Sequence, residues 1–176
     1  RKAQGLPGYA ELRCRSNFSF LNGASHPEEL VARAQALGYH ALALTDECSL
    51  AGAVRAHVEA ERLHMRLLIG TEMRLGAPGA GDARLVLLAE SRRGYVTLVR
   101  WITLARRRAP KGEYRAERAD AEGRAPTLPM LAGLPGCFVL LLPDPAASHE
   151  TLCEQAAWLH LWVGAERCAI AAELKR

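Results

Sequence analysis

The sequence predicts an α/β fold built around a parallel sheet. Short, mainly apolar runs occupy residues 41–45, 67–69, 84–89 and 137–142, and such runs are typical of strands buried on both faces. Segments with apolar residues at helical spacing alternate with several of these runs. Alternation of strands and helices favours a parallel sheet with helices packed outside it.

Each predicted element has a local signal. The predicted strands span residues 12–15, 41–45, 67–69, 84–89, 137–142 and 168–174. The predicted helices span residues 25–38, 50–64, 94–105 and 148–163. Ser25 and Glu28 form a capping-box pattern at the start of the first helix, and Gly38 ends it. Trp158 and Trp162 lie one turn apart on the last helix, where core packing is expected.

The composition limits the class of protein. The chain has 176 residues, 49% of them hydrophobic, which is enough to bury a core as one domain or most of one. Its net charge of +4 permits contact with nucleic acid without demonstrating it. The sequence has no apolar run of the roughly 18 residues that a membrane helix needs and no signal-peptide core at its start. Five cysteines without a Cys-x-x-Cys pair indicate reduced thiols, so we expect a cytoplasmic protein without a membrane segment.

Residues 106–134 are rich in Arg, Pro and Gly and are predicted to form a long connection. The most basic part of the chain lies there, and its cations include Arg106, Arg107, Arg108, Lys111 and Arg115. Two interpretations stay open. The segment is either a solvated, flexible surface loop or a contact for the phosphate backbone of a nucleic acid.

Four stretches resemble, in order, the motifs of the polymerase and histidinol phosphatase (PHP) domain family: residues 11–25, 41–52, 67–72 and 84–89. The segments Asn17-Phe-Ser-Phe20 and Asp46-Glu-Cys-Ser49 are most similar to the error-prone, DNA polymerase III α-subunit-like enzymes of the bacterial C family. The resemblance covers nearly the whole chain. It implies an incomplete, distorted parallel β/α barrel of the PHP type, whose site residues gather where the strands end.

The resemblance also implies a metal site, and the residues at its positions depart from the family pattern. The six alignable ligand positions hold Arg13, Arg15, Asp46, Glu47, Glu72 and Arg84. Asp46 and Glu72 match the family, whereas the other four replace histidines. A metal ligand must offer a lone pair, and a guanidinium group has none. We therefore expect no metal or cofactor and no catalytic residue in this segment, with arginine–carboxylate contacts instead. The alternative is that the six are unrelated surface charges.

Other residues with reactive side chains have simpler interpretations. Cys14 and Cys48 flank the expected site without an evident His or Asn partner, which favours a buried structural role over nucleophilic catalysis. Ser19 and Ser49 lack a Gly-x-Ser-x-Gly context and are interpreted as turn or cap residues.

The function implied by the resemblance is that of a catalytically silent structural module at the N-terminus of an error-prone DNA polymerase. The parent enzyme would act in damage-induced translesion synthesis, with magnesium-dependent polymerase domains beyond residue 176. Because the sequence begins without methionine and stops in a charged stretch, we expect a segment of a longer protein. The expected partners are the remainder of that chain, DNA through it, the sliding clamp and mutagenesis accessory proteins.

Two other functions remain open at this point. An active metal-dependent phosphoesterase or 3′–5′ exonuclease would attack a phosphate ester with metal-activated water, and it would need the histidines that this sequence replaces. A free-standing degenerate PHP protein would never have carried a polymerase.

Overall fold

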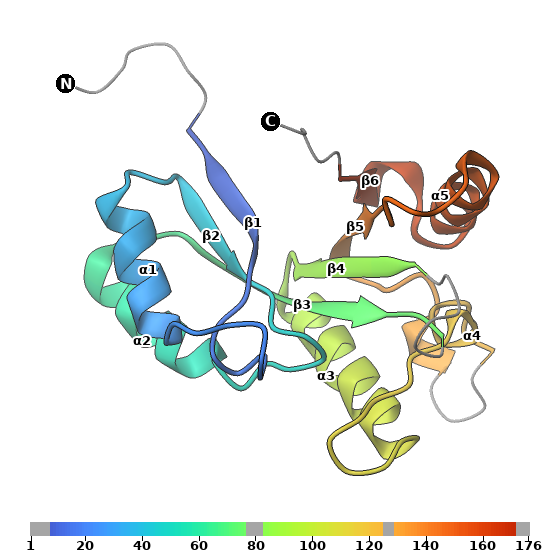
Figure 1. Ribbon diagram of the computed structural model, residues 1–176, viewed down its shortest axis with the longest axis horizontal. Helices are drawn as coiled ribbons and strands as arrows, with labels where there is room; N and C mark the ends of the chain where they lie inside the picture. Colours follow the sequence, from blue (N-terminus) through green and yellow to red (C-terminus); the bar gives the residue numbers. More distant parts are fainter. Residues whose placement is uncertain (1–7, 77–82, 125–128, 172–176) are drawn as a thin grey trace.

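Six strands form one curled sheet in the order β1-β2-β3-β4-β5-β6 (Figure 1). This computed structural model describes residues 8–76, 83–124 and 129–171. The strands are β1 (Ala10–Cys14), β2 (Ala41–Leu44), β3 (Leu67–Arg74), β4 (Arg84–Ala89), β5 (Cys137–Leu142) and β6 (Cys168–Ile170). The α-helices are α1 (Pro27–Ala36), α2 (Ala53–Leu63), α3 (Arg92–Arg107), α4 (Arg118–Ala121) and α5 (His149–Val163). Short 3-10 turns occupy η1 (Pro129–Leu131) and η2 (Ala165–Arg167).

The α/β class and the incomplete barrel are confirmed, but the sheet is mixed. β1 with β2, β2 with β3, and β5 with β6 are parallel pairs. β4 runs antiparallel to both of its neighbours, β3 and β5, which differs from the predicted parallel sheet. The physical reason is the length of the link between β3 and β4. Residues 75–83 are too few for the crossover of a dozen or more residues that a parallel pair requires.

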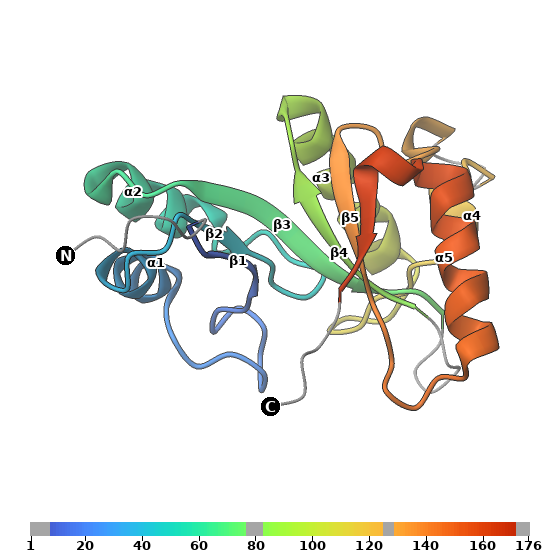
Figure 2. The ribbon, with the colours of Figure 1, turned by 90° about the horizontal axis from the view of Figure 1, so that it is seen from above.

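Among the described residues, the helices pack on one side of the curled sheet, and the core cluster on the other side contains strand residues only. α1 and α2 bury Val31, Ala34 and Ala56 against β2, and α3 and α5 pack around β4 and β5 through a larger cluster that includes Trp101 and Leu159. The third cluster contains residues of β1 to β5 only. Figure 2 shows the curl, with α1 and α2 beside one half of the sheet and α5 beside the other.

The start of α1 differs by one residue from the predicted cap. His26 is the N-cap residue, and its backbone N–H donates to the Glu29 carboxylate at 2.8 Å. The predicted pair of Ser25 and Glu28 is therefore wrong. Ser25 belongs to the preceding loop, because its carbonyl oxygen accepts a hydrogen bond from the Asn17 backbone N–H at 2.9 Å.

The basic connection, residues 106–134, is more structured than a solvated loop. It contains the last two residues of α3, all of α4 and the turn η1. Its apolar residues reach the main core: Ala116, Ala121, Leu131 and Leu134 are fully buried there. The predicted last strand ends earlier than Leu174, at Ile170, and residues 172–174 lie outside the described part of the chain. None of the helices in the described part is long and apolar enough to cross a membrane.

Candidate functional site

The end of the sheet where β1, β2 and β3 finish, here called the rim, brings together the six residues at the predicted ligand positions. Asp46 and Glu47 follow β2, and an isolated bridge pairs Glu47 with Glu72 of β3. Arg84 opens β4, and because β4 is antiparallel to β3, its start lies opposite Arg74 near the end of β3. The antiparallel pairing thus places the first residue of one strand at the rim where other strands end.

Glu72 is the centre of the rim. Its side chain is 0% exposed, and two arginines from the β1 segment hold its carboxylate. Arg13 donates from Nε to Oε2 at 2.9 Å and from Nη2 to Oε1 at 3.4 Å. Arg15 donates from Nε to Oε2 at 3.3 Å and from Nη2 to Oε1 at 2.5 Å. Burial raises the pKa of Glu72, but the hydrogen bonds and charges of the two arginines outweigh it and hold the pKa below its ordinary value.

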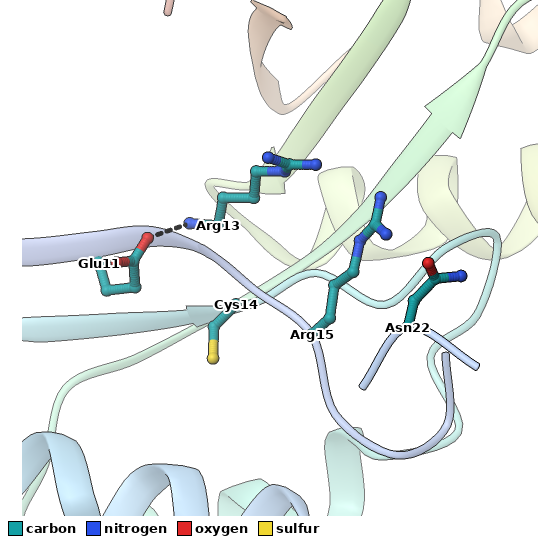
Figure 3. Close-up of a pocket in the computed structure, with 5 residues that line it drawn as sticks. All are labelled: Glu11, Arg13, Cys14, Arg15 and Asn22. Carbon is teal, nitrogen blue, oxygen red and sulfur yellow. Dashed lines mark hydrogen bonds between the residues drawn. The ribbon is translucent and has the colours of Figure 1, made fainter. Parts of the chain in front are cut away.

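The alternation of side chains along an extended segment explains why both arginines reach one carboxylate. Arg13 and Arg15 are two positions apart and point to the same side, whereas Cys14 between them points to the other (Figure 3). The two arginines, together with Glu11, Cys14 and Asn22, line an open pocket at this edge. The arginine–carboxylate contact expected from the sequence is therefore present.

Asp46 is held in a different way. Its carboxylate accepts hydrogen bonds from the Ser16 backbone N–H at 2.8 Å, from Ser16 Oγ at 2.7 Å and from Ser19 Oγ at 2.7 Å. Within the described residues, the salt bridges of the rim arginines go to Glu72 and Glu47 and not to Asp46. The interpretation of Ser19 as a simple turn residue was incomplete, because its hydroxyl also accepts from the Glu47 backbone N–H at 3.0 Å.

Glu47 lies at the outer side of the rim and depends on residues that the sequence did not reveal. Tyr114 Oη donates to its Oε1 at 2.9 Å, and Arg74 Nε lies 3.3 Å from the same oxygen. Burial, and then the negative charge of Glu47, raise the pKa of Tyr114. Two signals could have identified these residues. Arg74 follows Glu72 by two along a strand, and Tyr114 is the one tyrosine of residues 106–134.

Arg106 ties the basic connection to the same rim. Its guanidinium donates to the Cys48 carbonyl oxygen from Nε at 3.3 Å and from Nη2 at 3.1 Å, and it also lies 5.7 Å from the ring centre of Tyr114. Cys48 has a φ of 46°, in the left-handed region that a non-glycine residue adopts only when its surroundings hold it there. Arg106 and Tyr114 therefore support the rim through their hydrogen bonds to Cys48 and Glu47.

The predicted nucleic-acid contacts fall into two groups. Arg106, Arg108 and Arg115 have partners within the chain, with Arg108 2.7 Å from buried Asp120 and Arg115 2.6 Å from Glu117. Arg107 and Lys111 are exposed. Contact of this segment with a phosphate backbone stays a prediction, and Arg107 and Lys111 are the cations best placed to make it.

The two cysteines beside the rim are poorly suited to nucleophilic chemistry. Burial raises the pKa of Cys14 and of Cys48 to about 11. Since the thiolate is the nucleophile and the metal ligand, both side chains are protonated thiols at neutral pH.

The donor chemistry of the rim does not fit a metal ion. Both oxygens of Glu72 accept guanidinium hydrogen bonds, and both oxygens of Asp46 accept from the rim serines. Three of the six ligand positions carry guanidinium groups, which have no lone pair to give. In the described part of the chain, no group of three or more His, Cys, Asp or Glu side chains is placed to hold a metal ion.

The curled sheet with outer helices and a polar rim defines an α/β half-barrel. A solved structure from Bifidobacterium adolescentis, described as a candidate metal-dependent phosphoesterase, has the same fold, with a TM-score of 0.54. The alignment covers 86% of this chain and 75% of that one at 18% identity, so the likeness concerns the fold alone. Residues 11–160 match the PHP domain family, and this chain belongs to that family.

Curated relatives refine the family assignment. The chain is 54% identical over 166 residues to an error-prone DNA polymerase of Bordetella parapertussis, covering 90% of this chain and 16% of the relative. It is 52% identical over 171 residues to one of Ralstonia nicotianae, covering 97% and 16%. It is 46% identical over 176 residues to one of Xanthomonas axonopodis pv. citri, covering 100% and 15%. The chain thus spans about 16% of the length of such relatives, and the resemblance inferred from the four motifs is confirmed.

Proposed function

We propose that this chain is a catalytically degenerate PHP domain that serves as a structural module of an error-prone DNA polymerase. The observation that carries the proposal is the occupied carboxylate of Glu72, which is buried and bonded by Arg13 and Arg15. Hydrolysis of a phosphate ester by metal-activated water needs ligands with free lone pairs. Here both oxygens of the Glu72 carboxylate accept hydrogen bonds from two arginines, so the rim acts as a structural link between strand segments, called the brace below.

The brace connects segments that are far apart in the sequence. Arg15 and Glu72 are 57 residues apart, and Tyr114 and Glu47 are 67 residues apart. Charge-assisted hydrogen bonds of this kind are shorter and stronger than neutral ones. The rim thus links β1, β3 and the basic connection.

The wider role follows from the family. The parent chain would be a DNA-directed DNA polymerase acting in damage-induced translesion synthesis in the cytoplasm. Its polymerase domains would use magnesium for nucleotidyl transfer. The partners proposed by resemblance are DNA, the sliding clamp and mutagenesis accessory proteins, all through the parent chain.

The test uses the full-length parent protein. We expect magnesium-dependent primer extension, together with background levels of 3′–5′ exonuclease and phosphoesterase activity in manganese or zinc. Glu72→Gln and Asp46→Asn should leave these hydrolytic levels unchanged, as should the matched surface variant Glu61→Gln. Hydrolysis that is present in the wild type, lost in Glu72→Gln and kept in Glu61→Gln would establish the active phosphoesterase or exonuclease instead. A full-length protein without primer extension would support a degenerate PHP protein that carries no polymerase.

A further inference from the structure

The loop that follows β1, residues 16–25 and here called the rim loop, is tightly fixed. Backbone hydrogen bonds close it from Asn17 N to the Ser25 oxygen at 2.9 Å and from Gly23 N to the Ser19 oxygen at 2.9 Å. Gly23 packs so closely on the Ser16 carbonyl that a Cβ would not fit. Ser16 and Ser19 also anchor the loop to buried Asp46. The loop therefore has a defined shape in the described structure.

This fixed loop holds two large apolar side chains in solvent at its tip. Phe20 is 81% exposed and Leu21 is 105% exposed, the two highest values among the described large hydrophobic residues. Leu21 has a φ of 64°, in the left-handed region that disfavours a residue with a Cβ. A strained backbone at a non-glycine position persists where the surroundings impose it, and such strain clusters at functional sites.

Single exposed apolar side chains are normal on protein surfaces and need no explanation. Leu161 is an example, because it is 77% exposed but lies in the regular helix α5. The rim-loop tip differs in three respects that act together. Its two apolar residues are adjacent, their support is anchored to the buried rim, and one of them is held in an unfavourable backbone conformation.

We propose that the Phe20–Leu21 tip is a docking knob that inserts into an apolar pocket on the remainder of the parent polymerase chain. The proposal rests on the proposed function, because it takes the rest of that chain as the partner. The length of the relatives supports this occupant, since the matched stretch is only about 16% of each of them. The bulk of the parent chain is thus a large, covalently attached surface available to the tip.

The surroundings of the tip define the chemistry of the pocket. Asn22, next to the tip, lines the open rim pocket together with Glu11, Arg13 and Arg15. This adjoining surface is polar, with two cations against one carboxylate. The partner surface should therefore be apolar where it receives Phe20 and Leu21, with polar or acidic groups at its border toward the two arginines.

Side-chain oxidation by hydroxyl radicals in the full-length polymerase tests the knob directly, with the urea-unfolded chain as the reference for intrinsic reactivity. A pocket that covers roughly 90% of the two side chains should slow oxidation of Phe20 and Leu21 about tenfold relative to the unfolded chain. Leu161 is the internal control and should be oxidised nearly as fast as when unfolded. Oxidation of Phe20 and Leu21 at the rate of Leu161 would overturn the proposal.

The substitution Leu21→Asn distinguishes a free tip from a docked tip through two measurements, the stability of the domain and the oxidation of Phe20. Asparagine tolerates a positive φ, so without a partner this change relieves strain and leaves the domain as stable or more stable. With docking, it removes half of the knob, and oxidation of Phe20 in the full-length variant should rise severalfold. Leu161→Asn is the matched control and should not change Phe20 oxidation. Unchanged oxidation of Phe20 in Leu21→Asn would contradict the knob.

The remaining outcomes separate this proposal from the proposed function. Protection of the tip that disappears on dilution, together with a halved mass in light scattering, would identify a second copy as the occupant and overturn the proposal. A polymerase with an exposed tip and no hydrolytic activity would refute the knob alone. A protected tip in a protein whose hydrolysis is lost in Glu72→Gln would refute the degenerate function and leave the knob in place.

Discussion

Two buried carboxylates at neighbouring strand ends are stabilised in opposite ways. Glu72 is 0% exposed and receives its hydrogen bonds from two cations of the β1 segment. Asp46 is 1% exposed and receives its hydrogen bonds from the neutral donors of Ser16 and Ser19. The sequence resemblance predicts both carboxylates at metal-ligand positions, and the structure compensates their charges in two different ways.

This difference determines how strongly each carboxylate responds to the loss of its hydrogen-bonding partners. Burying an ion pair desolvates every charge involved, and that penalty can exceed the attraction, so the net gain at Glu72 is modest while both partners remain. Losing the cations would leave a bare buried charge. The serine donors of Asp46 are neutral, and each hydrogen bond to a charged group contributes about 1.5–3 kcal/mol. We therefore expect Glu72 to be the more sensitive of the two carboxylates to the loss of its partners.

The double variant Arg13→Ala/Arg15→Ala should produce the largest effect. It leaves Glu72 buried without a hydrogen-bonded cation, because Arg84 lies 3.9 Å away. Breaking a buried pair from one side costs about 3–5 kcal/mol, and we expect a loss of that size in the free energy of unfolding. Urea unfolding followed by circular dichroism measures it. Arg55→Ala removes an exposed pair with Glu28 and is the control; equal losses in both proteins would mean that burial of Glu72 has no energetic consequence.

The single variant Arg15→Ala should have an intermediate effect, because Arg13 still compensates Glu72. The rim is partly wet, with the Arg15 side chain 16% exposed, so we expect a loss of roughly 1–3 kcal/mol. Double-mutant cycles assign the coupling to a pair. The cycle with Glu72→Ala should show strong coupling and the cycle with Asp46→Ala little. The reverse order would show that the comparison between the two carboxylates is wrong.

Ser19→Ala tests the neutral side of the comparison. The change removes the donor to Asp46 Oδ1 and the acceptor for the Glu47 backbone N–H. The Ser16 backbone N–H still donates to the same oxygen, so we expect a loss of about 1–2 kcal/mol, smaller than for Arg15→Ala. Ser49→Ala is the control, since its hydroxyl accepts from Ala51 N in an exposed turn. A Ser19→Ala protein as stable as Ser49→Ala would show that Asp46 does not need its serine donors.

Acid should weaken the Glu72 brace. The arginines hold the pKa of Glu72 below its ordinary value, so the folded state binds the proton less readily than the unfolded state. The stabilisation is therefore complete above the unfolded pKa of about 4.3 and is lost as the pH falls through the folded value. Burial opposes the arginines, so the net effect is modest. Urea midpoints across this range should fall less steeply for Glu72→Gln than for the wild type, and parallel curves would contradict the linkage.

The fold could be predicted where the signal is local. β4 and β5 have the bounds that the sequence indicates, because each is an apolar run bordered by polar or turn-forming residues. The antiparallel direction of β4 is a non-local property that depends on how far the chain can reach between β3 and β4. The cap at His26 was missed by one residue, because a hydrogen bond from the Asn17 backbone N–H holds Ser25 in the rim loop.

Six members of the candidate site could be predicted from the sequence, but their pairing and the residues that support them could not. Five of the six rim residues lie at or near the ends of β1 to β3, and the antiparallel direction of β4 brings its first residue, Arg84, to the same place, so motif positions were sufficient to identify all six. Which donor reaches which carboxylate depends on side-chain length and on the shape of the rim loop. In the folded chain the serines donate to Asp46 and the arginines donate to Glu72. Tyr114 comes from a segment whose fold has no local signature, and the reach of Arg106 from the end of α3 to Cys48 depends on tertiary packing, so their contacts with Glu47 and Cys48 were missed.

Arg84→Ala should have the smallest effect at the rim. Its Nη1 is 3.9 Å from Glu72 Oε1, beyond hydrogen-bonding distance, and its side chain is 34% exposed. A long, partly solvated ion pair contributes about 0–1 kcal/mol, and the backbone pairing of β4 does not depend on the side chain. The free energy of unfolding of Arg84→Ala should therefore lie within that range of the wild type. A loss as large as that of Arg15→Ala would mean that Arg84 bonds to Glu72 directly in solution, and that three cations instead of two hold the central carboxylate.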